Sequence, residues 1–204
     1  MKSYPSITKE VRHGVYIYAF DKLDGSNIRA EWSSKKGFHK FGSRNQLIDS
    51  SHSPLGESIN LIKSKYENEL SEIFLKQKWQ DVLCFFEFYG KNSFAGIHLP
   101  EEHTVTLIDV NPYKQGILEP SYFVKYFGHL DIPKVLYEGS VSSTLFDQVK
   151  QSTLPNMTLE GVVCKGSNDK KTKMPIMFKI KSQAWLDKLK EHCKGDIDLF
   201  NKLS

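Results

Sequence analysis

The chain has 204 residues, of which 39% are hydrophobic and 25% are charged, and this composition excludes a wholly disordered chain. Its formal net charge of +4 is mildly basic, which is compatible with a polyanionic partner but does not require one. The length suits one full domain, and we find neither an internal repeat nor a low-complexity tract. We therefore expect a single domain over residues 1–204.

Several features concern the location of the protein. The N-terminal sequence has no apolar segment typical of a signal peptide, and no apolar run is long enough to span a bilayer. The three cysteines, Cys84, Cys164 and Cys193, are odd in number and lack CxxC spacing. They therefore predict neither a disulfide framework nor a zinc site, and two of them lie in apolar runs typical of buried strands. We expect a soluble cytoplasmic protein with no membrane partner.

The first half of the chain contains short apolar runs that are separated by turn residues, a pattern typical of strands. One long segment instead repeats apolar residues every three or four positions, which predicts a helix. In chain order, we expect strands over 15–20, 27–32 and 37–42, a helix over about 56–79, and strands over 81–90 and 104–110.

The second half continues with shorter elements. We expect helices over 119–127, 142–150 and 183–193, and a strand pair over 159–164 and 176–180 that is joined by a polar loop over 165–175. Strands outnumber helices, and they do not alternate with helices as in a parallel sheet. The sequence therefore predicts an α+β fold of largely antiparallel sheets with helices packed outside.

The segment Lys22-Leu-Asp-Gly-Ser-Asn27 directly follows the apolar strand over 15–20. By itself the motif is weak, because a solvated turn closed by glycine has the same residues. A lysine just past a core strand is nevertheless held rigidly, and Gly25 permits close approach of the backbone to a ligand. A lysine that acts as a nucleophile must lose its proton, so nearby cations or a metal should lower its pKa.

Other charged residues lie inside apolar strands, where a charge is costly unless it is paired or binds something. Glu87 lies among aromatic residues, Glu160 precedes two valines, and Lys179 and Lys181 share one face of a strand. Each of these residues also has a purely structural interpretation. Glu87 could pair with a structural lysine, Glu160 could open a strand at the surface, and the two lysines could lie on the solvent-exposed face of an edge strand. Their combination with Lys22 favours one shared site.

The ordered segments KLDGSN, FGSRN, FFEFYG, LEGVV and FKIKS resemble the signature motifs of the covalent nucleotidyltransferase superfamily. That superfamily contains ATP-dependent DNA and RNA ligases, NAD-dependent DNA ligases and mRNA-capping guanylyltransferases. The motifs extend over residues 22–181, and the last two are most similar to RNA ligases of the RNA-editing type. The resemblance implies an ATP-grasp-like ligase domain of antiparallel sheets flanked by helices, without an OB-fold domain.

The resemblance also implies residue roles. Lys22 would be the nucleophile that takes AMP from ATP, and Glu160 would help to hold a divalent metal, Mg²⁺ or Mn²⁺. Ile108 occupies the position of an aromatic residue that stacks on adenine in other members, which is a departure from the family pattern. The complete expected nucleotide-binding set is Asp21, Asp24, Gly25, Asn27, Arg44, Glu87, Ile108, Lys179 and Lys181. In this set, Arg44 would hold the ribose and the 5′-phosphate end, Glu87 the adenosine ribose, and the two lysines the α-phosphate.

The function implied is that of an ATP-dependent RNA ligase, which passes AMP to a 5′-phosphate end and joins that end to a 3′-hydroxyl. The expected partners are nucleic acid (RNA, or DNA and hybrid nicks) and an accessory protein that replaces the C-terminal domain of larger relatives. The alternatives are an ATP-dependent DNA ligase, a capping-type guanylyltransferase and a non-catalytic nucleic-acid-binding relative. Substrate phosphates are expected to contact Arg44, Lys179, Lys181 and the loop lysines Lys165, Lys170, Lys171 and Lys173.

Overall fold

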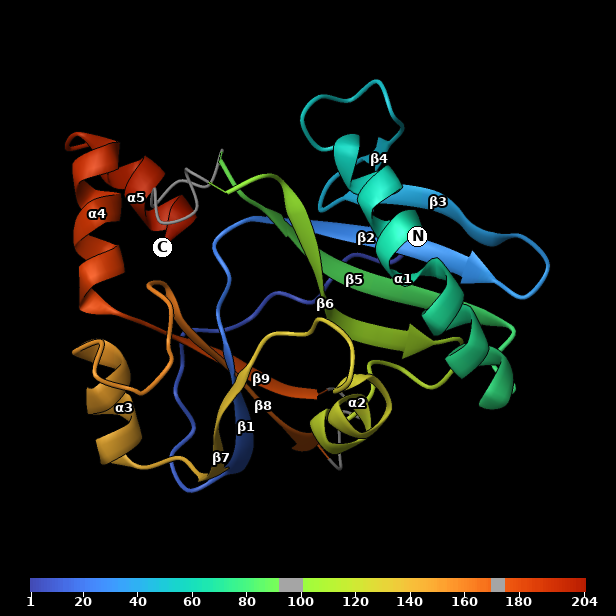
Figure 1. Ribbon diagram of the computed structural model, residues 1–204. Coiled ribbons are helices and arrows are strands. Elements are labelled where there is room, and N and C mark those ends of the chain that lie inside the picture. The colour runs from blue at the N-terminus through green and yellow to red at the C-terminus, as the bar shows by residue number, and fades with distance from the viewer. Residues whose placement is uncertain (92–100, 170–174) are drawn as a thin grey trace. The chain divides into compact units, whose positions relative to one another are not determined.

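The computed structural model describes residues 1–91, 101–169 and 175–204 (Figure 1). The described residues form nine strands and five helices, and the strands pair antiparallel in two sheets. The predicted α+β class is therefore confirmed. By its internal contacts the chain divides into two compact units. Of the described residues, unit 1 contains 1–6, 25–91 and 101–132, and unit 2 contains 7–24, 133–169 and 175–204. The single domain expected over residues 1–204 stays a prediction.

Unit 1 contains a five-stranded sheet with the strand order β4-β3-β2-β5-β6. The long helix α1 covers one face of this sheet (Figure 1) because its apolar stripe matches the aromatic residues of the strands. The rings of Tyr66 and Phe86 lie 5.2 Å apart, and those of Phe74 and Trp32 lie 5.0 Å apart. The elements of unit 1 are β2 (Ser26–Ser33), β3 (Gly37–Ser43), β4 (Leu47–Ile48), α1 (Glu57–Lys76), β5 (Asp81–Tyr89), β6 (Thr104–Pro112) and α2 (Pro120–Phe127).

The other face of the unit 1 sheet has its own apolar cluster. Leu83, Phe85 and Ile117 are buried there, and Tyr4 and Ile108 pack against them. The N-terminal residues 1–6 thus pack, through Tyr4, on this face of the sheet. They lie beside residues of β5, the strand that also contains Glu87.

Unit 2 contains a four-stranded sheet with the strand order β7-β1-β8-β9. Ile17, Val162 and Phe178 from three of its strands are fully buried, together with Val149 of α3. A second cluster joins α4 and α5 through Trp185, Leu189 and Phe200. The elements of unit 2 are β1 (Tyr16–Asp21), β7 (Val135–Ser140), α3 (Ser143–Lys150), β8 (Gly161–Asn168), β9 (Pro175–Lys181), α4 (Gln183–Cys193) and α5 (Ile197–Leu203).

The structure corrects the predicted loop over 165–175. Strand β8 continues to Asn168, because Lys165 pairs with Met177 and Asn168 pairs with Pro175 across the hairpin. Lys165 is only 5% exposed, and its Nζ atom lies 4.8 Å from the ring centre of Phe20. The prediction that Lys165 is a loop lysine is therefore wrong. The predicted loop residues Lys170, Lys171 and Lys173 lie outside the described residues.

The remaining general expectations concern the cysteines and the membrane. Cys84, Cys164 and Cys193 are free and buried; burial was predicted for Cys84 and Cys164. Burial raises the pKa of the Cys164 thiol to about 12. Within the described parts of the chain, no helix combines the length and the apolar character that crossing a bilayer requires.

Candidate active site

Lys22, Glu160 and Lys181 form a cluster of ion pairs in unit 2, and we call these three residues the lysine–glutamate cluster. The Nζ atom of Lys22 lies 2.9 Å from Glu160 Oε2, and the Nζ atom of Lys181 lies 3.0 Å from Glu160 Oε1. The cluster joins residues from three motifs that were predicted to share a site, so this part of the predicted grouping is present in the fold.

The backbone around the cluster explains its geometry. Lys22 directly follows β1, and its N–H donates to the carbonyl of Gly161 at 2.9 Å, which places it beside the start of β8. Ser182 fixes the opposite side, because its N–H donates to the Glu160 carbonyl at 3.0 Å and its hydroxyl donates to the Leu159 carbonyl at 2.5 Å. The same Ser182 oxygen accepts from Trp185 N–H and caps α4.

Gly161 allows β8 and β9 to come together at this point. Its φ of +130° is rarely adopted by residues with side chains, and a Cβ atom there would stand 2.1 Å from the carbonyl oxygen of Ile180. Glu160 precedes Gly161 in the sequence, and Lys181 follows Ile180. The close approach of Gly161 to Ile180 therefore brings the carboxylate of Glu160 near the amine of Lys181.

The cluster is largely buried, and its charges do not cancel. The side chains of Glu160 and Lys181 are 4% and 8% exposed, and that of Lys22 is 19% exposed. With both lysines protonated, two positive charges face one negative charge, which favours the binding of an anion such as phosphate. The pKa of Lys181 is lowered to about 8, and burial of the ammonium is the largest cause. The negative charge of Glu160 opposes this shift, whereas the positive charge of Lys22 adds to it.

Lys179 lies two residues before Lys181 on β9, and both side chains point to the same region. Lys179 Nζ donates to the Ser204 carbonyl at 3.0 Å, and Lys181 Nζ donates to the Leu203 carbonyl at 3.2 Å. Lys181 also lies 3.6 Å from the ring centre of Trp185, in a cation–π contact. The prediction that the two lysines share one face of a strand is therefore confirmed.

Asp21 makes a structural contact that the sequence did not indicate. Its side chain is buried, and Oδ1 accepts hydrogen bonds from the N–H and the hydroxyl of Thr158, at 3.0 and 3.1 Å. This contact fixes the end of β1 to the segment that leads into Glu160. The nucleotide contacts predicted for Asp21 and for Asp24, which is half-buried, stay predictions.

Unit 1 brings together two other predicted residues. Asn27 of β2 pairs with Glu87 of β5 in the antiparallel register, so their side chains are direct cross-strand neighbours. The amide nitrogen and oxygen of Asn27 are both buried, and neither has a hydrogen-bond partner within the described part of the chain. A buried amide without partners is costly, and a polar ligand beside Glu87 would supply them.

Ile108 lies at an irregularity in the same sheet. Phe85 pairs with Asp109 and Phe86 pairs with Leu107, so Ile108 is the extra residue of a β-bulge. It packs in the cluster that contains Phe85 and Tyr4. The adenine contact predicted for Ile108 stays a prediction.

Tyr4 is a candidate residue that the sequence analysis missed. Its ring lies 4.9 Å from that of Phe85, and its hydroxyl donates a hydrogen bond to Asp109 Oδ2. Burial raises the pKa of Tyr4, and the charges of Asp109 and Glu87 raise it further. No motif marks this tyrosine, because its contacts form only when residues 1–6 pack on the sheet.

The two arginines of unit 1 differ in their availability. Arg29 is 6% exposed, and its guanidinium donates to the carbonyls of Ser43 and Met1 at 2.7 and 2.9 Å. Arg44 is exposed in the turn after β3, and among the described residues its guanidinium has no hydrogen-bond partner. Arg44 is therefore the more exposed arginine of the two, and the ligand contacts predicted for it stay predictions.

The donors available for a divalent metal are sparse. Among the described residues there is no group of three or more His, Cys, Asp or Glu side chains that could hold a metal ion. Mg²⁺ does not require such a group, because it commonly binds one or two carboxylates together with phosphate oxygens and water. Glu160 fits that role only in the presence of a phosphate ligand, and its assignment as a metal ligand stays a prediction.

The comparisons with known proteins identify the fold. No family model matches the sequence, and no curated protein matches it. Solved structures of an RNA ligase from Naegleria gruberi do match the fold. A mutant with ATP and Mn has a TM-score of 0.65 at 15% identity, covering 92% of this chain and 59% of that one. A mutant with AMP and Mn has a TM-score of 0.64 at 15% identity, covering 86% and 52%. The form with PPi has a TM-score of 0.62 at 16% identity, covering 88% and 53%.

The chain therefore has the fold of these RNA ligase structures. It spans a little more than half of the length of the RNA ligase chains that it matches. The resemblance that five short motifs indicated is confirmed at the level of the fold.

Proposed function

We propose that this protein is an ATP-dependent RNA ligase that forms a lysyl-AMP intermediate on Lys22. The observation that carries the proposal is the lysine–glutamate cluster, in which one buried carboxylate pairs with Lys22 at 2.9 Å and with Lys181 at 3.0 Å. A partly buried lysine beside further cations meets the requirements of a nucleophile that attacks a phosphoanhydride. The RNA ligase fold supports this choice over other lysine chemistry.

In the first step, neutral Lys22 Nζ attacks the α-phosphorus of ATP. A P–N bond forms, the bond between the α-phosphorus and the bridging oxygen breaks, and pyrophosphate leaves. The nitrogen gives up a proton, and Glu160 Oε2, at 2.9 Å, is positioned to accept it. Lys179 and Lys181 stabilise the charge that develops on the phosphoryl oxygens.

A divalent metal fits this arrangement as a partner of the phosphates. When bound, Mg²⁺ or Mn²⁺ neutralises phosphate charge, and Glu160 would hold it, through water, together with phosphate oxygens. The related RNA ligase has been solved with ATP and Mn, which supports the use of a divalent ion.

The residues of unit 1 complete the proposal. Asn27 has a buried amide that finds no hydrogen-bond partner among the described residues, and its cross-strand neighbour is Glu87; we assign these two side chains to the nucleoside. Arg44 is exposed, and we assign it to the 5′-phosphate of the RNA end, which a guanidinium binds in bidentate geometry. AMP then passes from Lys22 to that phosphate, and attack by a 3′-hydroxyl joins the strands and releases AMP.

The first experiment tests the covalent step. Purified protein is incubated with Mg²⁺ and with α-labelled ATP, α-labelled GTP or adenylate-labelled NAD, and the products are separated on a denaturing gel. We expect labelling by ATP, loss of the label in Lys22→Ala, and normal labelling in the control Lys190→Ala, which removes an exposed lysine of α4. Labelling by GTP would indicate a guanylyltransferase, and no labelling would indicate a non-catalytic relative.

The second experiment tests strand joining. Nicked duplexes with a 5′-phosphate carry RNA or DNA on each side of the nick, and sealing is measured on a denaturing gel. We expect best sealing when RNA supplies the 3′-hydroxyl. Equal or better sealing of all-DNA nicks would instead indicate a DNA ligase.

A further inference from the structure

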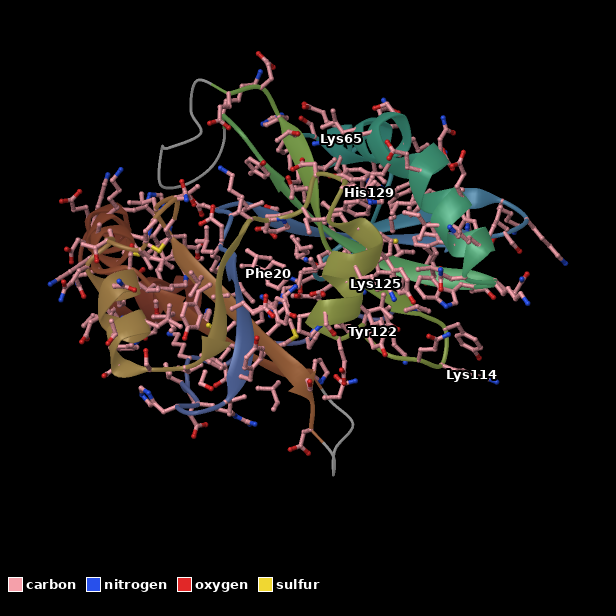
Figure 2. The ribbon with its side chains drawn as sticks, turned by 60° about the horizontal axis from the view of Figure 1, so that its bottom comes forward. Phe20, Lys65, Lys114, Tyr122, Lys125 and His129 are labelled. Atoms are coloured by element: carbon pink, nitrogen blue, oxygen red, sulfur yellow. The ribbon has the colours of Figure 1, made fainter. Side chains whose placement is uncertain are left out.

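The outer face of α2 carries exposed aromatic and basic side chains that the proposed chemistry does not use. Tyr122 is 50% exposed, Lys125 is exposed and Tyr126 is half-buried. Lys125 and Tyr126 lie three and four positions after Tyr122, so both are its neighbours on the surface of the helix; we call the three residues the tyrosine stripe. Figure 2 labels Tyr122 and Lys125 on α2, with His129 beyond the end of the helix.

The rings of the stripe are arranged as a platform. Tyr122 and Tyr126 stack with a centre distance of 6.2 Å and an interplanar angle of 21°. Tyr126 also rests against Trp79, at 6.0 Å and 85°. On the inner side of α2, Phe123 and Phe127 are fully buried and fix the helix to the core of unit 1. The outward rings thus stand on a helix that the core fixes, and Tyr122 is the more exposed of the two.

Two of the exposed rings have a lysine beside them, and the acidic residue next to the helix is its N-cap, Glu119. No acidic residue lies within α2, and Lys125 Nζ lies 6.0 Å from the ring centre of Tyr126. A second pair of the same kind lies in the turn after β6, where Tyr113 is 68% exposed and Lys114 Nζ lies 5.3 Å from its ring centre. The N–H of Tyr113 donates to the carbonyl of Asp81 at 3.0 Å, two residues after Trp79.

We propose that the tyrosine stripe, with Tyr113 and Lys114, binds a single-stranded segment of the RNA substrate, an inference that rests on the proposed ligase function. Surfaces that bind single strands without sequence preference combine aromatic rings, on which bases stack, with cations that contact the backbone. The stripe supplies both within one rigid helix. A protein partner is less well matched, because the rings are interleaved with lysines that would have to lose their solvation.

The test measures RNA binding apart from ligation. The affinity of a fluorescein-labelled oligouridine is measured by anisotropy over a range of salt concentrations. We expect Tyr122→Ala to weaken binding about 5- to 100-fold, the range for loss of one stacked base, with an unchanged salt slope. We expect Lys125→Ala to weaken binding and to reduce the salt slope by about 0.7, the value for one phosphate contact on a single strand.

The controls keep this inference separate from the proposed function. Tyr16→Ala removes a tyrosine that is 57% exposed on β1 of unit 2 and should leave RNA binding unchanged. Tyr122→Phe retains the ring and should bind like the wild type. Labelling with ATP requires no RNA, so Tyr122→Ala should be adenylylated normally.

Each contrary result has its own meaning. Wild-type labelling together with unchanged RNA binding in Tyr122→Ala would overturn the stripe alone, whereas a lack of labelling in the wild type would overturn the ligase function. Absence of RNA binding by the wild type would also overturn the stripe. So would a wild-type dimer in sedimentation that Tyr122→Ala dissociates, because the stripe would then be a protein interface.

Discussion

Gly25 and Phe88 lie so close that a Cβ atom built on the glycine would stand 2.3 Å from the carbonyl oxygen of the phenylalanine. The Cβ atom of Tyr89 would be 2.8 Å away. Gly25 directly precedes β2, whose first residue pairs with Phe88 of β5. From the sequence, this glycine was assigned to close approach of a ligand. Within unit 1, the close approach is that of the protein's own neighbouring strand.

We predict that Gly25→Ala destabilises the protein by about 1–3 kcal/mol, the typical cost of adding a methyl group to a filled site. Because the strand that must move carries Glu87, formation of the adduct should fall as well. Urea unfolding and ATP labelling measure the two effects. The control Gly116→Ala has positive φ but open space around the new atom, so it should show only the backbone strain. A Gly25→Ala protein of wild-type stability would contradict this account.

A second prediction concerns the anion of the lysine–glutamate cluster. Glu160→Gln retains the size of the side chain but removes its charge, so the positions and charges of Lys22 and Lys181 change. We expect adduct formation to fall by ~10²-fold or more, since the variant loses both a proton acceptor and a site for the metal. Rates are measured over a range of Mg²⁺ concentrations, and urea unfolding checks the fold.

The matched control for this variant is Glu191→Gln, which neutralises an exposed glutamate of α4. Recovery of Glu160→Gln at high Mg²⁺ would indicate that the carboxylate acts mainly through the metal. Near-normal rates at every Mg²⁺ concentration would remove Glu160 from the site.

A third prediction follows from the pKa of Lys181, which is about 8 in the folded protein. Lys181 is protonated below this pH and loses its charge above it, so its attraction for phosphate weakens as the pH rises. We expect the ATP concentration for half-maximal labelling to rise above pH 8, and this rise to be absent in Lys181→Arg, whose side chain stays charged. A pH-independent half-saturation in the wild type would contradict the assignment.

The same pKa has an effect on stability with a definite sign. The folded pKa is lower than the ordinary lysine pKa of 10.5, so between about pH 8 and pH 10.5 the unfolded chain binds more protons at this residue. The contribution of Lys181 to the free energy of unfolding therefore rises with pH in that window. Below pH 8 the full cost of burying the ammonium remains.

Much of unit 2's site was predictable because its chemistry is unusual in a core. Lys22, Glu160 and Lys181 are charges in apolar surroundings, and such charges must meet a partner. The sequence predicted that they share a site, but it could not show that both lysines pair directly with Glu160, since this pairing depends on the approach of β8 to β9 at Gly161.

The features that were not predicted lack a local signal. Strand β7 (Val135–Ser140) is mostly exposed or half-buried at the edge of its sheet, so it has no apolar alternation. The end of β8 is polar in sequence, so it was predicted as the start of a loop. These residues are in a strand because they pair with β9. Tyr4 reaches Asp109 from 105 residues away in sequence, and only the tertiary fold brings the two together.

The last prediction concerns Arg44 and asks whether this residue acts on ATP or on the RNA end. Its guanidinium is exposed and has no hydrogen-bond partner among the described residues, so its substitution should leave the fold intact. We predict that Arg44→Ala retains most of its labelling by ATP but transfers AMP to 5′-phosphorylated RNA roughly tenfold or more slowly, because a charge-assisted contact to the phosphate is lost.

This prediction is checked by mixing pre-labelled protein with 5′-phosphorylated RNA and following both the loss of label from protein and its appearance on RNA. Arg44→Lys should recover part of the rate, because a lysine supplies the charge without the bidentate geometry. Arg12→Ala, which removes an exposed arginine of unit 2, is the matched control and should behave like the wild type. Equal slowing of labelling and of transfer in Arg44→Ala would place this residue at the ATP instead of at the RNA end.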